Sequence, residues 1–172
     1  GNPALGKAAG DINNPINRAA VGGKINYHNK DYVESGGAFA QAEYSKNDFT
    51  VFFTLSGSEN ADKRIDYFNY LNTDPNQTSP TVNFLTYQAK TGANYNINSQ
   101  MNVFANIGYL TKPPYFANVF ENFTNEINKN SVTEKLFSYE LGYGYKTSDF
   151  SAKVNLYRTS YMDRAFASTY SD

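Results

Sequence analysis

Few side chains in this chain of 172 residues could carry out nucleophilic or acid–base chemistry. Histidine occurs once, at His28, and cysteine is absent. A Cys/His pair is therefore impossible, and a Ser/His/Asp triad would have to use His28, which lies in an irregular N-terminal stretch. No glycine-rich phosphate loop precedes a helical pattern. We predict no catalytic residues and no cofactor, and therefore a protein that is not an enzyme.

Calcium binding is the one metal chemistry that the side chains suggest. Asp62, Asp66 and Asp74 lie in one long polar stretch, and carboxylate oxygens are ligands that calcium prefers. Acidic residues in loops are more often simply solvated, and without cysteine there is no thiolate site. We therefore predict no metal site.

Aromatic residues beside arginine and asparagine are the best candidates for contact with a ligand. They gather in two polar stretches, roughly residues 59–83 and 111–135. Rings next to amide and guanidinium groups suit a sugar, a siderophore or another small amphipathic nutrient. The competing explanation is that the rings pack the loops against one another. The candidates are Arg64, Tyr67, Phe68, Tyr70, Tyr115, Phe116, Asn118 and Phe120.

Segments with a period of two residues flank these stretches and must position them. Apolar and polar residues alternate in each, which indicates antiparallel β-strands with one apolar face. Thr91 is the only clearly polar residue on the apolar side of the pattern. We expect strands near 37–45, 49–58, 84–96, 101–110, 136–147 and 150–161. The charged residues of these segments fall on the other face, where they would line a barrel lumen: Glu43, Lys90, Glu140, Lys146 and Lys153.

The connections between the segments alternate between short and long. Turns of a few residues near 46–48, 97–100 and 147–149 alternate with the two long polar stretches. Outer-membrane barrels have this arrangement, with short periplasmic turns and long external loops. We therefore expect an all-β fold: an antiparallel transmembrane β-barrel segment of about six to eight strands. A soluble sheet with one buried face gives the same alternation.

Composition excludes several other classes of protein. The net charge is −1, from 15 basic and 16 acidic residues, so no field strong enough to gather nucleic acid is expected. No apolar run approaches the ~20 residues of a membrane-spanning helix. The mean hydropathy of −0.60 is typical of soluble proteins. Alternating strands also have modest average hydropathy while one face stays apolar, so this value does not exclude a barrel.

The first 36 residues are less regular. Residues 21–28 alternate weakly and could form a short strand or part of a large external loop. The loop fits the topology better, because the first clear strand runs into a short turn. We therefore divide the chain into an external-loop region, 1–36, and a partial barrel, 37–172.

Four motifs, in this order and spacing, resemble the barrel domain of TonB-dependent outer-membrane receptors. They are GGAFAQAEY at residues 36–44, KPPYFANVF at 112–120, EKLFSYELGYGYK at 134–146 and FSAKVNLYR at 150–158. No single motif is highly specific. The resemblance covers most of the chain from Gly23 onward and implies active uptake of a scarce nutrient such as a siderophore, vitamin or oligosaccharide.

The resemblance also implies a location and partners. A receptor of this family lies in the outer membrane of a Gram-negative bacterium, with lipid around its wall, a plug domain in its lumen and TonB bound through a segment that is not in this sequence. Such barrels have about 22 strands. We therefore expect this chain to be a fragment from the C-terminal half of the barrel. The glycines Gly142 and Gly144 would either let the plug approach the wall or accommodate its curvature.

A second class of function remains open on the residues alone. A secreted or surface-exposed β-sandwich could recognise glycans through the same loop aromatics. The sequence does not identify the transported ligand, because receptors of one fold vary their loops and plug.

Overall fold

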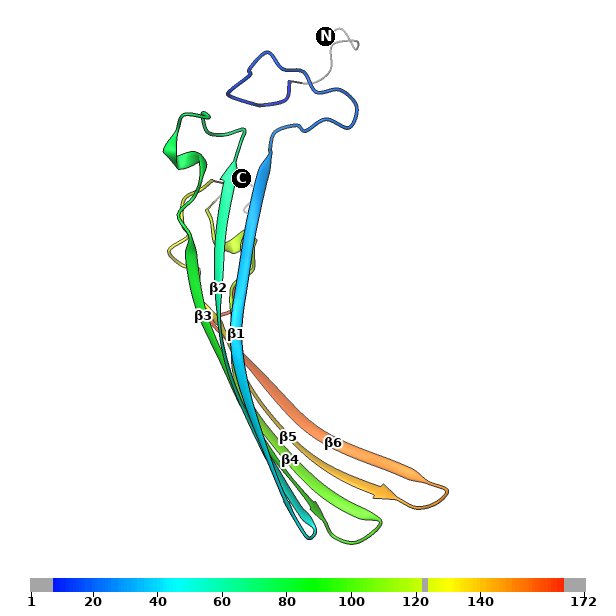
Figure 1. Cartoon of the computed structure of the whole chain (residues 1–172). Helices are drawn as coiled ribbons and strands as arrows, with labels where there is room; N and C mark the ends of the chain where they lie inside the picture. The colour runs from blue at the N-terminus through cyan, green and yellow to red at the C-terminus, as the bar shows by residue number, and fades with distance from the viewer. Residues whose placement is uncertain (1–7, 122–123, 166–172) are drawn as a thin grey trace. The chain divides into compact units, whose positions relative to one another are not determined.

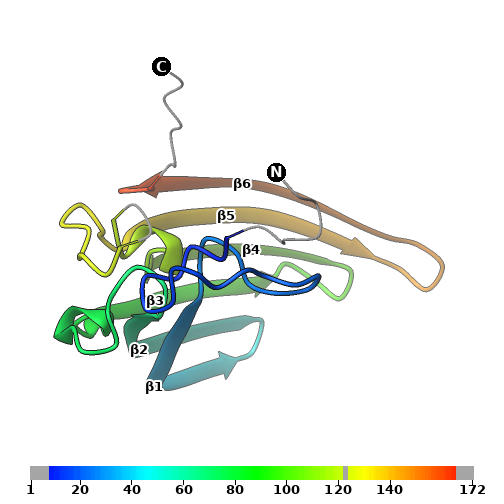
Figure 2. The same cartoon turned by 90° about the horizontal axis from the view of Figure 1, so that it is seen from above.

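The protein is all-β. The structure, a computed structural model, describes residues 8–121 and 124–165. Figures 1 and 2 show six antiparallel strands that follow one another across a single sheet in chain order. The strands are β1 (Asn29–Lys46), β2 (Phe49–Asp66), β3 (Val82–Asn96), β4 (Met101–Lys112), β5 (Glu134–Lys146) and β6 (Ser151–Met162). The expectation of an antiparallel all-β fold with six strands is confirmed.

Helical structure is confined to two single turns. The 3₁₀ helices η1 (Pro75–Gln77) and η2 (Phe116–Asn118) lie in the two long connections. Asp74 begins η1, since its carboxylate accepts a hydrogen bond from the Asn76 backbone N–H at 2.8 Å. None of the described helices is long and apolar enough to cross a membrane.

The chain forms two compact units. Unit 1 comprises Gly1–Glu34, Ala61–Asn83 and Tyr115–Ser131, and therefore brings the N-terminal region together with the two long connections. Unit 2 comprises Ser35–Asn60, Phe84–Pro114 and Val132–Asp172, which hold the regular part of the sheet. The strands β1 and β2 contribute residues to both units.

Two strands are longer than the sequence pattern predicts. β1 begins at Asn29 rather than near residue 37, and β2 continues to Asp66 rather than ending near residue 58. The added residues are mostly polar on both sides, with Tyr32, Val33, Ala61 and Ile65 as exceptions, so the apolar signal fades although the strands continue. A ring contact contributes to pairing there, because the Nζ atoms of Lys30 and Lys63 lie 4.7 and 5.2 Å from the centre of the Tyr32 ring.

The weak alternation of residues 21–28 does not form a strand. Residues 21–22 form a turn and Asn26 a bend, and the backbone takes positive φ angles of 85° at Gly22 and 69° at Asn26. A residue in the left-handed region breaks an extended run, and Gly and Asn adopt that region most readily. The loop interpretation of these residues is the one that the structure supports.

Strand register determines which side chains share a face of the sheet in unit 2. Lys90 pairs with Gly108, and Gly108 pairs with Ser138. One step along, the paired residues are Thr91, Ile107, Tyr139 and Arg158. Directly paired residues lie on the same face, so these two rows lie on opposite faces.

The sheet of the described residues is open. Its strand order begins at β1 and ends at β6, so each of these two strands has a neighbour on one side only. Figure 2 shows them at opposite edges. Closure into a barrel is therefore not a property of this chain by itself.

The core of unit 1 is small and rich in polar groups. Phe68, Val119 and Phe120 are buried there, together with the charged residues Arg64 and Asp66. Asp66 Oδ1 accepts hydrogen bonds of 3.0 Å from the backbone N–H groups of Phe68 and Asn69, and its other oxygen lies 3.7 Å from Arg64 Nη2. A buried carboxylate with several charge-assisted partners is stable in such an environment.

Candidate functional site

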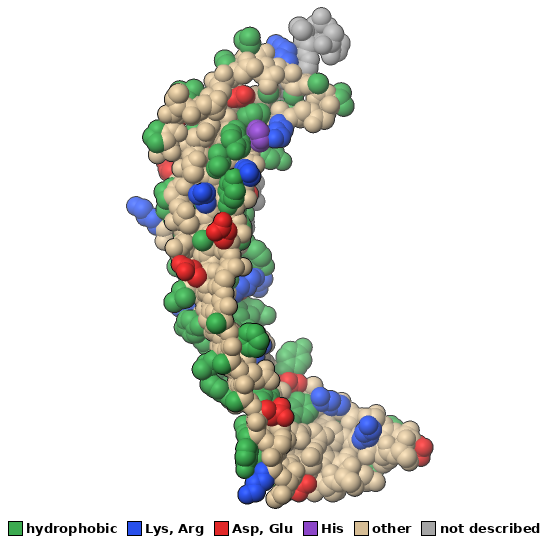
Figure 3. Space-filling model, in the orientation of Figure 1, with side chains coloured by type: hydrophobic (Ala, Val, Ile, Leu, Met, Phe, Trp, Pro, Cys, Tyr) green, Lys and Arg blue, Asp and Glu red, His purple; other side chains and the backbone are tan. Residues whose placement is uncertain are grey.

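One face of unit 2 exposes a continuous set of apolar side chains. Leu85 and Leu156 are 72% and 71% exposed, respectively. In the lower half of Figure 3, apolar side chains line the left edge of the molecule, and others project on the right. Exposed apolar patches of this kind mark contact surfaces. Further members of the set are Tyr44, Phe53, Leu55, Tyr87, Tyr95, Ile107, Tyr139, Leu141, Tyr143 and Val154.

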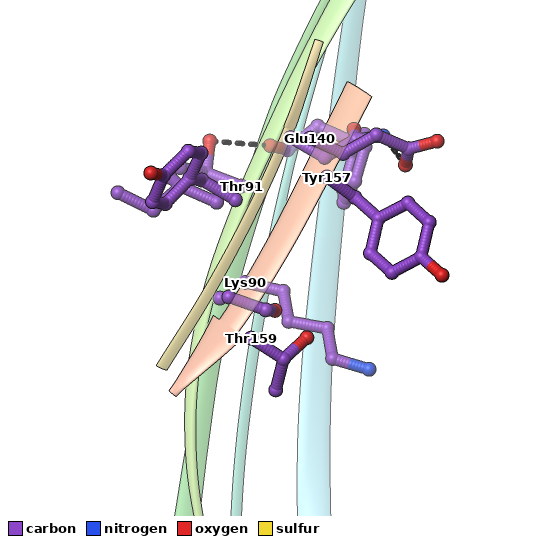
Figure 4. A pocket seen from close by; sticks show the side chains of 11 residues that line it. Lys90, Thr91, Glu140, Tyr157 and Thr159 are labelled. Atoms are coloured by element: carbon purple, nitrogen blue, oxygen red, sulfur yellow. Dashed lines mark hydrogen bonds between the residues drawn. The ribbon is translucent and has the colours of Figure 1, made fainter. Parts of the chain in front are cut away.

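The polar residues on this apolar face direct their hydroxyls to the backbone. Thr91 Oγ1 donates to the Phe52 carbonyl at 2.8 Å, and Figure 4 shows this bond. Thr111 Oγ1 accepts from the Tyr87 backbone N–H at 2.8 Å. Both hydroxyls are therefore paired internally, which removes the main cost of placing them in apolar surroundings.

The apolar face is not free of charge over the full length of the strands. β6 continues past Leu156, and its register places Arg158 opposite Tyr139 on that face. Lys135 also lies there, near the start of β5, and its Nζ lies 2.6 Å from Asp163 Oδ2. The sequence pattern indicates that all charged residues of the strands lie on the polar face. In the structure this holds for the middle of β5 and β6 but not for the parts that contain Lys135 and Arg158.

The opposite face contains the predicted lumen residues Lys90 and Glu140. Figure 4 shows both side chains pointing to one side of the sheet, with Thr91 on the other. They border an open hollow of about 520 Å³. Glu140 is held by two amides, because Asn106 Nδ2 donates to Oε2 at 3.1 Å and Asn155 Nδ2 donates to Oε1 at 2.7 Å.

The remaining predicted lumen residues lie on the same polar face. Lys153 pairs with Gly144, and Lys146 pairs with Ser151 two residues along each strand. The side-chain oxygens Ser45 Oγ and Thr50 Oγ1 lie 2.8 Å apart, so these two residues face each other across β1 and β2. Two residues further along each strand, Glu43 therefore faces Phe52 on the same side of the sheet. The five charges therefore share one face of the sheet.

The glycines of the polar face are covered by side chains of neighbouring strands. A Cβ atom at Gly142 would overlap the Phe104 ring, and one at Gly92 would meet Phe52 Cε1 at 2.6 Å. Lys153 Nζ lies 4.3 Å above the Phe104 ring, on which a cation is attracted to the π electrons. Close approach at Gly142 therefore comes from the sheet itself, an explanation that the sequence did not suggest.

The predicted ligand residues all lie in unit 1, but three of them are buried. Arg64, Phe68 and Phe120 are 6%, 7% and 4% exposed. Arg64 faces Asp66, and Phe120 packs against Phe116 with ring centres 5.5 Å apart. These side chains stabilise the loops and are not available to grip a ligand, so for them the packing explanation is correct.

The other candidates are more accessible. Tyr115 is 66% exposed, and Tyr67, Tyr70, Phe116 and Asn118 are half-buried. Tyr67 lies against His28, with ring centres 4.7 Å apart, and the His28 Nε2 atom contacts Lys24 Nζ. His28 is thus part of a surface aromatic contact in unit 1.

The three aspartates that suggested calcium have separate structural roles. Asp66 is fully buried with Arg64, and Asp74 begins η1. Asp62 is 4% exposed, and its burial raises the pKa of its carboxyl group above the usual range. Among the described residues, no group of three or more acidic, histidine or cysteine side chains could hold a metal ion.

One residue that sequence reasoning did not identify is Asn125. It is 5% exposed and lies in the connection between β4 and β5. Its Nδ2 donates to the carbonyls of Asn76 at 2.8 Å and Gln77 at 2.7 Å, both in the connection between β2 and β3. Its backbone N–H donates to Tyr70 Oη at 3.1 Å. Asparagine is frequent in both connections, so nothing in the sequence distinguishes this one.

Comparison with known proteins gave no relative. No protein family, curated protein or solved structure matches the chain. Its function is therefore argued from its own residues.

Proposed function

We propose that this chain is part of the wall of a TonB-dependent outer-membrane receptor that takes up a scarce small nutrient. The single observation that carries the proposal is the exposed apolar face of unit 2, opposite a face that holds the charges of Glu43, Lys90, Glu140, Lys146 and Lys153. Lipid is the partner that fits such a face. The plug domain and TonB are the proposed protein partners, and the open edges of β1 and β6 would pair with further strands of the receptor.

The length of the apolar face supports lipid as its partner. On β3 it runs from Leu85 to Tyr95, which is about 34 Å at ~3.4 Å per residue. At a strand tilt of ~40° the height is about 26 Å, and the apolar band of outer-membrane barrels is ~25 Å tall. Tyrosines lie near both ends of the face, as in the aromatic girdles of such barrels.

A soluble sandwich fits the same observations less well. It would cover its apolar face with a second sheet, whereas the residues that the structure describes form one sheet. The glycan-binding sandwich therefore becomes the weaker proposal.

Two neighbouring residues of β6 provide the test. Leu156 lies on the apolar face and Asn155 on the polar face, and both are exposed. A lysine on the lipid side of a barrel costs about 2–4 kcal/mol near the bilayer midplane, whereas substitutions on the lumen side are tolerated. Leu156→Lys should therefore reduce insertion of the chain into lipid vesicles, and Asn155→Lys should leave insertion near the original level.

Insertion is measured as the fraction of protein that floats with vesicles after a urea wash. The proposal that this chain is part of a membrane wall would be refuted if the two variants float equally. It would also be refuted if the unsubstituted chain stays monomeric in buffer without detergent. If insertion holds, the receptor assignment is tested separately by locating the parent protein in purified outer membranes and by its dependence on TonB for uptake.

A further inference from the structure

An open pocket in unit 1 lies beside the single histidine of the chain. It has a volume of about 510 Å³. Small-molecule sites occupy roughly 300–1,000 Å³. The lining comes from one short segment and contains a lysine and a histidine but no acidic residue, so it can attract an anion. The lining residues are Gly23, Lys24, Ile25, Tyr27, His28 and Asn29.

The segment that forms the pocket is held in place by contacts with other parts of unit 1. The Asn26 backbone N–H donates to the Ala9 carbonyl at 2.8 Å, and the Tyr67 backbone N–H donates to the His28 carbonyl at 2.9 Å. The His28 ring packs against the rings of Tyr67 and Phe68, with centres 4.7 and 5.5 Å away. A site whose side chains are already positioned loses little conformational freedom when a ligand binds.

Lys24 and His28 bring two nitrogen atoms together in this pocket. The Lys24 ammonium group contacts His28 Nε2. An ammonium group can only donate, so the imidazole accepts at Nε2 and has its proton on Nδ1. Lysine has three N–H donors, and the Lys24 side chain is exposed, so two donors remain for a ligand.

Two more lysines lie near this pair. Lys30 and Tyr32 follow His28 at intervals of two residues, so the three side chains lie on one side of the chain, with Lys30 about 7 Å along the strand from His28. The Nζ atoms of Lys30 and Lys63 lie 4.7 and 5.2 Å from the centre of the Tyr32 ring. In the upper part of Figure 3, blue side chains lie around the purple histidine.

The three lysines are not neutralised by acids of their own chain. Among the described residues, none of Lys24, Lys30 and Lys63 forms an ion pair. The net charge of the whole chain is −1, so this surface is locally positive on a nearly neutral protein. Neighbouring like charges repel each other, and an anion from outside the chain would relieve that repulsion.

We propose that this pocket binds a small organic anion with at least two carboxylate groups. One carboxylate accepts hydrogen bonds from Lys24 Nζ beside His28, and a second lies against Lys30. The size of the pocket favours a small molecule over an extended anionic surface. The inference deepens the proposed function, and rests on it only in treating this anion as the class of nutrient that the loops contact.

The test follows His28 directly, because the only histidine of the chain gives imidazole resonances that need no further assignment. The full chain, prepared without a histidine tag, is folded in an uncharged detergent, and citrate is added at constant pH. The imidazole ¹H–¹³C resonances should shift along a saturable curve. Sodium chloride at equal ionic strength controls for screening and should produce no such curve.

Lys24→Gln should weaken citrate binding about tenfold, the effect of losing one hydrogen bond from a charged donor. Lys129→Gln is the matched control, because Lys129 is an exposed lysine of unit 1 that does not line the pocket. It removes the same charge and should leave the citrate curve unchanged.

The proposal is overturned if citrate gives no saturable shift, if sodium chloride reproduces the shift, or if both glutamine variants weaken binding alike. It is also overturned if phosphatidylglycerol added to the micelles shifts the resonances and citrate does not, since the site would then take a lipid headgroup. Vesicle insertion is measured on the same preparations, so failure of the anion site and failure of the membrane wall are separate results.

Discussion

At the scale of single residues, the polar face of unit 2 depends on glycines that leave room for their neighbours. The Phe104 ring lies over Gly142, and Lys153 Nζ lies 4.3 Å from the centre of that ring. A large side chain over a glycine on an adjacent strand shields backbone that would otherwise be bare, which is a known device for stabilising sheets. The glycine therefore belongs to a packed group of three residues.

Gly142→Ala should destabilise the chain by about 1–3 kcal/mol, because the new methyl group forces the Phe104 ring to move. The urea midpoint in detergent measures this loss. Gly36→Ala is the control, since nothing lies within 4 Å of a Cβ at that position. Adding Phe104→Ala to Gly142→Ala should cost less than the sum of the two single changes, and strict additivity would contradict the contact.

Asp62 makes the stability of unit 1 depend on pH in an unusual direction. Burial raises the pKa of its carboxyl above the ordinary value of 3.8, which the unfolded chain retains. Folding therefore favours the neutral carboxyl group. Its contribution to the free energy of unfolding is fully present below pH 3.8 and is lost as the pH rises through the pKa of the carboxyl in the folded chain. Asp62→Asn should therefore raise stability at pH 7 and flatten this part of the pH profile.

Thermal unfolding followed by circular dichroism between pH 4 and pH 8 measures this effect. Glu59→Gln serves as the control, because Glu59 is an exposed carboxylate on the same strand. A stability gain for Asp62→Asn that is the same at every pH would show that charge burial is not its cause.

At the scale of elements, the turn between β1 and β2 depends on one left-handed residue. Asn47 has a φ of 53°, a conformation that Asn and Gly tolerate and β-branched residues do not. Asn47→Gly should leave the urea midpoint nearly unchanged, whereas Asn47→Val should cost about 1–2 kcal/mol. If both variants unfold at the same urea concentration, the turn does not control formation of the hairpin.

The sequence predicts strands well where apolar and polar residues alternate, and poorly where they do not. All six strands were expected, and the five charges Glu43, Lys90, Glu140, Lys146 and Lys153 share one face of the sheet. The extension of β1 toward Asn29 was missed because both of its sides are mostly polar and neither is clearly apolar. Arg158 was missed because the apolar pattern fades at Leu156 while the hydrogen-bonded register continues.

The two long connections were predictable from the sequence, but the roles of their residues were not. Both connections contribute to unit 1, where Arg64, Phe68 and Phe120 are buried, and Asn125 was not singled out. Aromatic and polar residue types are common to loop packing and ligand contact. Only their burial and partners in the folded chain distinguish the two roles.

At the scale of the whole molecule, the strands should differ in how strongly they resist opening. β4 has a paired neighbour on each side, and β6 has one. Amide hydrogen exchange should therefore be slowest in β4 and markedly faster in β6, because fewer contacts must break to free its N–H groups. Equal protection of the two strands would indicate that β6 gains a partner, as it would in a sheet extended by another chain.

The strand count has a further consequence for how the sheet can grow. Neighbouring strands run in opposite directions, so an even number leaves the two boundary strands β1 and β6 pointing opposite ways. A second six-stranded block can then be added beside β6 in the same orientation, with its own first strand antiparallel to β6. A strand that pairs antiparallel with β6 therefore runs in the same direction as β1.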